Sequence, residues 1–163
     1  MTAQAWKGMK FLISVDAEGL QGVTFGTQVL PGENDYHVGK ESMIKSTNAV
    51  LEGLYLGGAS HVTAVDAHDG NRNLEASSID HRARVILGWP KPMSMAQGVQ
   101  ETDALVLLGY HSKAGTADGV LSHTYSTNIL QNLLGFFLGY MEFLDNHILC
   151  SQFQLFIVPR LMS

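Results

Sequence analysis

The segment KFLISVDAEG, residues 10–19, decides the fold, because a short apolar run leads directly into two acidic residues and a glycine. The run from Phe11 to Val15 is rich in strand-forming residues and ends abruptly at Asp16, which is typical of a buried strand. The segment therefore predicts a strand over residues 10–15 whose carboxyl end presents two carboxylates, those of Asp16 and Glu18.

Further strands and helices are expected on the carboxyl-terminal side of this strand. Glycines and a proline between residues 19 and 32 indicate a loop. Apolar residues at three- and four-residue spacing after Asn34, with a stop at Gly57 and Gly58, predict an amphipathic helix. The remaining expected elements are strands over residues 61–65, 84–87 and 104–108 and a short helix over residues 93–101. Strands that alternate with helices predict an α/β fold, with a mainly parallel sheet and helices on both faces.

Composition excludes several classes of protein. The chain has 163 residues, which favours one domain, and 45% hydrophobic against 15% charged residues argue for a packed core rather than disorder. A net charge of -5 disfavours a nucleic-acid partner. Cys150 is the one cysteine, so no internal disulfide is expected. No signal peptide or membrane segment is predicted, and a cytoplasmic location fits best.

The carboxylates of Asp16 and Glu18 lie two residues apart, so in an extended chain both side chains leave the same face. Two carboxylates that close repel each other unless one is protonated or a cation lies between them. A metal ion would provide that cation. The alternative is that the pair only caps a loop in solvent, which is the commoner role of an isolated acidic pair.

Other candidate ligands follow other strands. Asp66 and His68 come after the second expected strand, and His111 follows the last one. Open α/β sheets bind ligands beyond the carboxyl ends of their strands. We therefore expect these side chains to meet Asp16 and Glu18 at one edge of the sheet. Mixed carboxylate and imidazole ligands suit zinc or a similar divalent ion, and a carboxylate can bridge two such ions.

His123 lies in the segment GVLSHT, which follows a glycine-rich stretch. Its imidazole could act as a general acid or base, or as a donor to a transition state near the metals. The adjacent Ser122 is not a catalytic partner, because neighbouring side chains rarely face each other. The glycine-rich segments match neither dinucleotide nor Walker patterns, so nucleotide binding has little support.

Five ordered motifs resemble one family, the D-aminopeptidase family of dinuclear zinc peptidases, typified by the D-aminopeptidase of a dipeptide-transport operon. They are SVDAEG (14–19), VDAHDGNRN (65–73), KPMSMAQG (91–98), LLGYHSKAGT (107–116) and GVLSHT (119–124). The resemblance covers about residues 9–128. It implies hydrolysis of an N-terminal D-residue, such as D-alanine, from short peptides at a site with two Zn²⁺ ions, in a ring-shaped homo-oligomer.

The resemblance also implies a role for each matching residue. Asp16 is expected to bridge the two metals and Glu18 to bind one of them. His68 and His111 match the family's histidine ligands. His123 matches the histidine that lies beside the metals and serves catalysis.

The carboxyl-terminal part departs from the family. The family's fifth ligand is a glutamate in a Gly-Glu segment, whereas this chain has Tyr140 at that place and Glu142 two positions later. The expected organisation is an N-terminal extension (residues 1–8), an α/β metal-binding catalytic domain (residues 9–128) and a divergent apolar segment (residues 129–163). Family members continue well beyond this length, so the fold is expected to be truncated. The apolar segment either docks against another subunit or does not follow from what precedes it.

These expectations lead to a zinc-dependent aminopeptidase that acts on short peptides and assembles as a homo-oligomer. Two alternatives stay open. One is an inactive or truncated metal-binding, oligomer-forming relative. The other is a metallohydrolase acting on a phosphoester, which uses the same ligand types but would need a basic cluster that the motifs do not contain.

Overall fold

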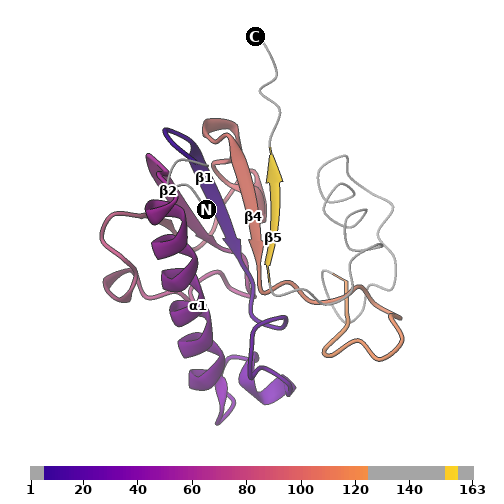
Figure 1. Cartoon of the computed structure of the whole chain (residues 1–163). Coiled ribbons are helices and arrows are strands. Elements are labelled where there is room, and N and C mark those ends of the chain that lie inside the picture. Colours follow the sequence, from indigo (N-terminus) through magenta and orange to yellow (C-terminus); the bar gives the residue numbers. More distant parts are fainter. Residues whose placement is uncertain (1–5, 125–152, 158–163) are drawn as a thin grey trace.

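A computed structural model of the protein describes residues 6–124 and 153–157, which form one five-stranded sheet (Figure 1). The strands are β1 (Lys10–Val15), β2 (His61–Asp66), β3 (Arg84–Ile86), β4 (Ala104–Leu108) and β5 (Phe153–Ile157). The two strongest strand predictions, over residues 10–15 and 104–108, match β1 and β4 in full. The other two agree to within one residue.

The order of the strands is β3-β2-β1-β4-β5, and the first four run parallel. The expected α/β fold with a mainly parallel sheet is therefore confirmed. The chain moves outward from β1 through β2 to β3 and then returns to place β4 on the other side of β1. The strand order thus reverses between β1 and β4, where open α/β sheets form a ligand-binding crevice at their carboxyl ends.

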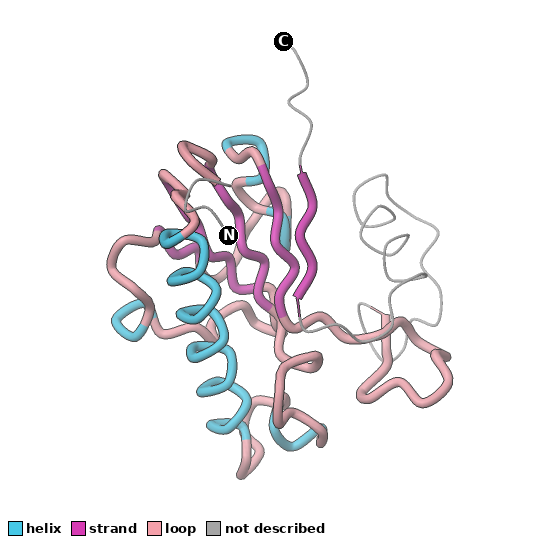
Figure 2. Tube along the Cα trace, viewed as in Figure 1, coloured by secondary structure: helices cyan, strands magenta, loops and turns pink. Residues whose placement is uncertain are grey.

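One face of the sheet is covered by α1 (Tyr36–Leu56), the helix seen along one side of the strands in Figure 2. Alternate residues of β1 point toward this face because strand side chains have a period of two. They pack with apolar residues of the helix. The core on this side includes Phe11, Ile13 and Val15 from β1 and Met43, Leu51 and Leu54 from α1.

The opposite face of the sheet is covered by a loop with short helical turns. Leu12, Val65 and Leu107 form the core on this side, and Val99 packs against it. The turns are η3 (Ser94–Ala96) and η4 (Val99–Glu101), so the single short helix predicted over residues 93–101 was wrong. Gly98 separates the two turns with a positive φ of 99°, which an α-helix does not allow. Similar turns, η1 (Gly26–Gln28) and η2 (Ala76–Ser78), lie in the loops after β1 and β2.

The fifth strand, β5, was not predicted from the sequence. This strand pairs antiparallel with β4, with Ala104 opposite Ile157 and Leu108 opposite Phe153. In Figure 1 its arrow points opposite to that of β4. The sequence around β5 has no clear alternation of strand and helix patterns, which is the signal used to find the other strands. Among the described residues, no helix is long and apolar enough to cross a membrane.

Backbone contact between two loops holds the carboxyl ends of β1 and β4 together. The amide of Gly19 donates to the carbonyl of Gly109 at 2.7 Å, and the amide of Asp16 donates to the carbonyl of Leu108 at 2.8 Å. A Cβ atom at Gly19 would collide with the carbonyl oxygen of Tyr110. Gly19 therefore permits an approach of the two loops that any side chain at this position would prevent.

This contact predicts opposite effects for two glycine-to-alanine substitutions. Gly19→Ala should lower the free energy of unfolding by about 1–3 kcal/mol, because the new methyl group must displace the backbone after β4. Gly53→Ala is the control, since Gly53 lies in α1 with nothing near its missing Cβ, and alanine favours helix by about 0.8–1 kcal/mol. Denaturant unfolding of both variants measures the difference. Equal stability of Gly19→Ala and the wild-type chain would contradict the proposed contact.

Candidate metal centre

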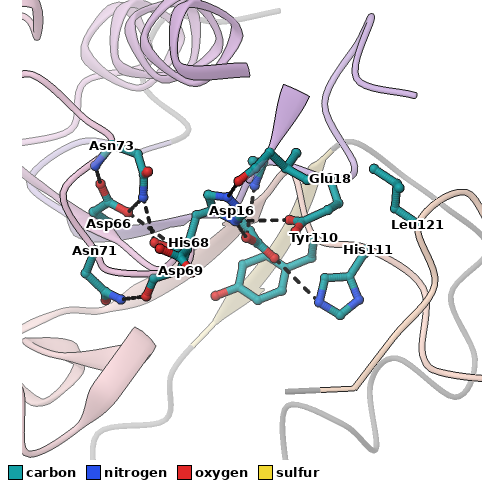
Figure 3. Close-up of polar contacts among 12 residues, drawn as sticks. Asp16, Glu18, Asp66, His68, Asp69, Asn71, Asn73, Tyr110, His111 and Leu121 are labelled. Carbon is teal, nitrogen blue, oxygen red and sulfur yellow. Dashed lines mark hydrogen bonds and ion pairs between the residues drawn. The ribbon is translucent and has the colours of Figure 1, made fainter. Parts of the chain in front are cut away.

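The two carboxylates that follow β1 are buried beside the histidine that follows β2 (Figure 3). Asp16 is 6% exposed, Glu18 7% and His68 5%. Nδ1 of His68 lies 3.1 Å from Oδ1 of Asp16 and 3.3 Å from Oε2 of Glu18. One potential ligand atom from each of the three residues falls within 4.8 Å of the others, a spacing that could hold a metal ion.

Two further histidines approach the other oxygens of the same carboxylates. Nε2 of His111 lies 3.8 Å from Oδ2 of Asp16, and Nε2 of His123 lies 3.9 Å from Oε1 of Glu18. The rings of His111 and His123 stack with their centroids 3.6 Å apart. Of the six predicted site residues, the structure therefore brings five together. Glu142 lies outside the described residues.

Each of the three imidazoles has one ring nitrogen against a backbone carbonyl. Nε2 of His68 contacts the carbonyl of Val29 at 2.7 Å. Nδ1 of His111 contacts that of Ser112 at 2.9 Å, and Nδ1 of His123 contacts that of Leu121 at 2.7 Å. A carbonyl oxygen only accepts hydrogen bonds, so these nitrogens carry protons. Metal-binding histidines are held in this way, because a hydrogen bond from one ring nitrogen leaves the other nitrogen for the metal. Here the other nitrogen of each ring faces a carboxylate.

The charges of the group call for a cation. Burial lowers the pKa of His68, but the hydrogen bond to Asp16 and the negative charges of Asp16 and Glu18 outweigh the effect of burial and raise that pKa to about 11. Burial would raise the pKa of Asp16, yet the hydrogen bond from His68 and the charge of His111 hold it below its usual value. Oε2 of Glu18 is buried without a hydrogen bond from the described residues. Two buried carboxylates, one with an unsatisfied oxygen, fit a divalent metal ion.

Asp66 does not join this group, although it was expected at the same edge. Its carboxylate accepts hydrogen bonds from the amides of His68, Asn73 and Leu74 and from the side chain of Asn73. Asp66 is fully buried and holds the loop after β2 in shape. The spacing along a strand end cannot reveal which carboxylate faces the cavity and which faces its own loop.

A buried lysine, Lys91, supports the same loop. No role was predicted for it from the sequence. Nζ of Lys91 donates to the carbonyl of Asp66 and to Oδ1 of Asn71. Lys91 is 6% exposed, and its ammonium lies over the ring of Trp89. A signal was present, because Lys91 is the first residue of KPMSMAQG, the third motif that resembles the family, but a lysine in a loop is usually solvated.

Tyr110 and Ser14 tie the β4 loop to β1 and to the loop before η3. The hydroxyl of Ser14 donates to the carbonyl of Met95 at 2.7 Å and lies 2.6 Å from the hydroxyl of Tyr110. Since a serine has one hydroxyl proton, Tyr110 is the donor in the second bond. This bond fixes the wall on which Met95 and Tyr110 face the site.

A cavity of about 400 Å³ opens over the carboxylate–histidine group. Asp16, Glu18, His68, His111 and His123 line one part of it. The remaining described lining residues are Val29, Leu30, Ala67, Asp69, Asn71, Trp89, Ser94, Met95 and Tyr110. His37, His61 and His81 are not among the residues that line this cavity. His147 and Cys150 lie outside the described residues.

Fold and site together define a class: an α/β protein with a carboxylate–histidine group, suited to divalent metals, at the reversal of its strand order. A sequence model of the D-aminopeptidase family matches residues 9–154. A D-aminopeptidase of Bacillus subtilis strain 168 is 34% identical over 117 residues, which cover 71% of this chain and 42% of the relative. The chain belongs to the D-aminopeptidase family, as the five motifs suggested.

A solved structure supports the same relationship. It is described as the Zn-dependent D-aminopeptidase DppA from Bacillus subtilis, a self-compartmentalizing protease. The two folds align with a TM-score of 0.70 at 32% identity, covering 73% of this chain and 43% of DppA. The chain thus spans less than half the length of the relatives that it matches.

The geometry predicts that zinc stabilises the chain through Glu18. Zn²⁺ at about 100 times its Kd should raise the free energy of unfolding of the wild-type chain by about 2.7 kcal/mol. Glu18→Gln removes a charged ligand, and a tenfold weaker Kd would reduce that gain by about 1.4 kcal/mol. Denaturant unfolding with and without zinc measures both values. Glu33→Gln, at an exposed position outside the cavity, is the control and should behave as the wild type. Equal zinc gains for the two variants would argue against the site.

Proposed function

We propose that this chain forms the zinc-binding part of an aminopeptidase that removes N-terminal D-residues, such as D-alanine, from short peptides. The observation that carries the proposal is the orientation of three histidines around two buried carboxylates. Each histidine directs one ring nitrogen at one or both of these carboxylates. Membership of the D-aminopeptidase family and the zinc dependence stated for DppA support it.

The two carboxylates favour two ions rather than one. Oδ1 of Asp16 faces His68, whereas its Oδ2 faces His111. Glu18 repeats this division, with Oε2 toward His68 and Oε1 toward His123. Asp16 therefore lies between two groups of ligands, as a bridging carboxylate would. We propose Asp16, Glu18, His68 and His111 as ligands of two Zn²⁺ ions. Glu142, outside the described residues, remains the candidate for a fifth.

When bound, zinc supplies a Lewis acid that polarises a carbonyl group and lowers the pKa of a water ligand toward about 7. The residues of the chain provide position and proton transfer. The Nδ1–H of His123 is held by the carbonyl of Leu121, so Nε2 faces the site and is free to exchange a proton. We propose that Nε2 of His123 takes up a proton and passes it to the leaving amine, or that the protonated ring stabilises the charged intermediate.

Part of the cavity suits a short apolar stretch of peptide. Trp89, Met95 and Leu30 give it an apolar wall, and the bound part of a substrate would be shielded from water there. Among its described lining residues there is no lysine or arginine. A phosphoester substrate, which needs such cations, therefore has less support than a peptide.

Turnover by the purified chain tests the activity. The zinc-loaded chain should hydrolyse D-alanyl-D-alanine and not L-alanyl-L-alanine, and removal of zinc by a chelator should stop the reaction. The alternative is a metal-binding relative without activity, and the limited coverage of the family's length gives it a specific basis. Zinc binding without hydrolysis of either peptide would favour that alternative.

Asp16 should matter more to metal binding than His123. Asp16→Ala removes the shared negative charge and leaves two cations to repel each other, so paired occupancy should be lost and turnover abolished. His123→Ala should keep two zinc ions per chain and lose about 10²–10⁴-fold in kcat, the usual contribution of a general acid or base. Metal analysis and hydrolysis of D-alanyl-D-alanine distinguish the variants. Two zinc ions in Asp16→Ala would show that the bridging role is misassigned.

We also propose that the chain assembles into a ring-shaped homo-oligomer, and the self-compartmentalizing nature of DppA supports this proposal. Large apolar side chains are exposed on the described surface, including Phe25 (69%), Leu56 (69%) and Trp89 (50%). Exposed apolar groups of this kind are typical of interfaces when they gather into a patch. Sedimentation at micromolar concentration should give a mass several times that of one chain. A monomer under these conditions would contradict the proposal.

A further inference from the structure

A third acidic residue, Asp69, is among the residues that line the cavity beside the carboxylate–histidine group. The other carboxylates among the described lining residues, Asp16 and Glu18, are engaged with histidines. Asp69 is exposed, and within the described part of the chain its carboxylate has no hydrogen bond or ion pair. Its negative charge is therefore available to a ligand in the cavity.

A buried network holds Asp69 in place. Nδ2 of Asn71 donates to the main-chain carbonyl of Asp69 at 2.6 Å, and Asn71 is itself 2% exposed and bound by Lys91. Asp69 and Asn71 have positive φ values of 42° and 57°, a region that residues other than glycine enter at some energetic cost. The loop after β2 thus holds Asp69 in one particular backbone conformation, although that conformation is unfavourable.

Asp69 lies close to the place where the amino group of a bound peptide is expected. The ammonium of a peptide lies two bonds from the carbonyl carbon of its first peptide bond, so it must bind close to the metals. Asp69 follows His68 directly, with its Cα about 3.8 Å from that of the histidine. No lysine or arginine among the described lining residues competes for this carboxylate.

We propose that the Asp69 carboxylate binds the N-terminal ammonium of the substrate. The inference rests on the proposed aminopeptidase function and names the residue that selects peptides with a free, protonated N-terminus. N-acylated peptides lack the charge and leave the carboxylate without a partner. Asp69 then determines specificity, while Asp16, Glu18 and the histidines serve the metals.

Binding of two peptides to the zinc-loaded full chain tests the proposal. Calorimetry compares D-alanyl-D-alanine with N-acetyl-D-alanyl-D-alanine, and hydrolysis of the first peptide is measured in parallel. Asp69→Asn keeps the size of the side chain and a residue type that tolerates positive φ. Asp118→Asn is the matched control, because Asp118 is also exposed with a positive φ of 58° but does not line the cavity.

Asp69→Asn should bind D-alanyl-D-alanine at least about tenfold more weakly than the wild type, the usual loss for a charged hydrogen bond, and should raise KM. It should keep the wild-type zinc content and the wild-type affinity for the acetylated peptide, and Asp118→Asn should match the wild type throughout. Unchanged D-alanyl-D-alanine binding, equal weakening in both variants, equal weakening toward both peptides, or loss of zinc in Asp69→Asn would each overturn the assignment.

The calorimetric result separates this inference from the proposed function. If the wild-type chain binds D-alanyl-D-alanine through Asp69 but does not hydrolyse it, the ammonium site stands and the peptidase activity fails. If the chain hydrolyses the peptide and Asp69→Asn does so with the same KM, the activity stands and the ammonium site fails.

Discussion

The burial of two carboxylates beside imidazole rings is the constraint on which the rest of the structure depends. Asp16 and Glu18 are both less than a tenth exposed. Removing such charges from water is unfavourable unless partners of opposite charge replace the water. His68 supplies one partner, and the oxygens that face His111 and His123 leave positions for others. The orientation of the three imidazoles toward the carboxylates and the preference for a divalent cation follow from this one requirement.

Backbone packing makes the arrangement possible. Side chains from β1, β2 and β4 meet only because these strands are parallel neighbours and end at the same edge. Gly19 lets the loop after β1 lie directly against the loop after β4, and this contact brings His111 toward Asp16. A glycine without a functional side chain thus helps to set the separation of two proposed metal ligands.

Lys91 connects a motif late in the sequence with the loop that carries His68. Its ammonium replaces lost hydration with the carbonyl of Asp66 and the side chain of Asn71. Asp66 binds the same loop from the other side through main-chain amides. With both supports the loop holds His68 against the carboxylates of Asp16 and Glu18 and keeps Asp69 in the cavity lining. Two motifs separated in sequence therefore form one structural unit.

The sequence by itself determined β1, β2 and β4, the helix that covers them and five of the proposed site residues, because hydrophobic periodicity and strand ends are local properties. Only the tertiary structure decided which oxygen of Asp16 faces which histidine, that Asp66 supports its own loop, and that Asp69 lines the cavity. The pairing of β5 with β4 and the division of residues 93–101 into two turns were also decided there. Each depends on contacts between distant residues or on one glycine's backbone angle, and local patterns do not encode these.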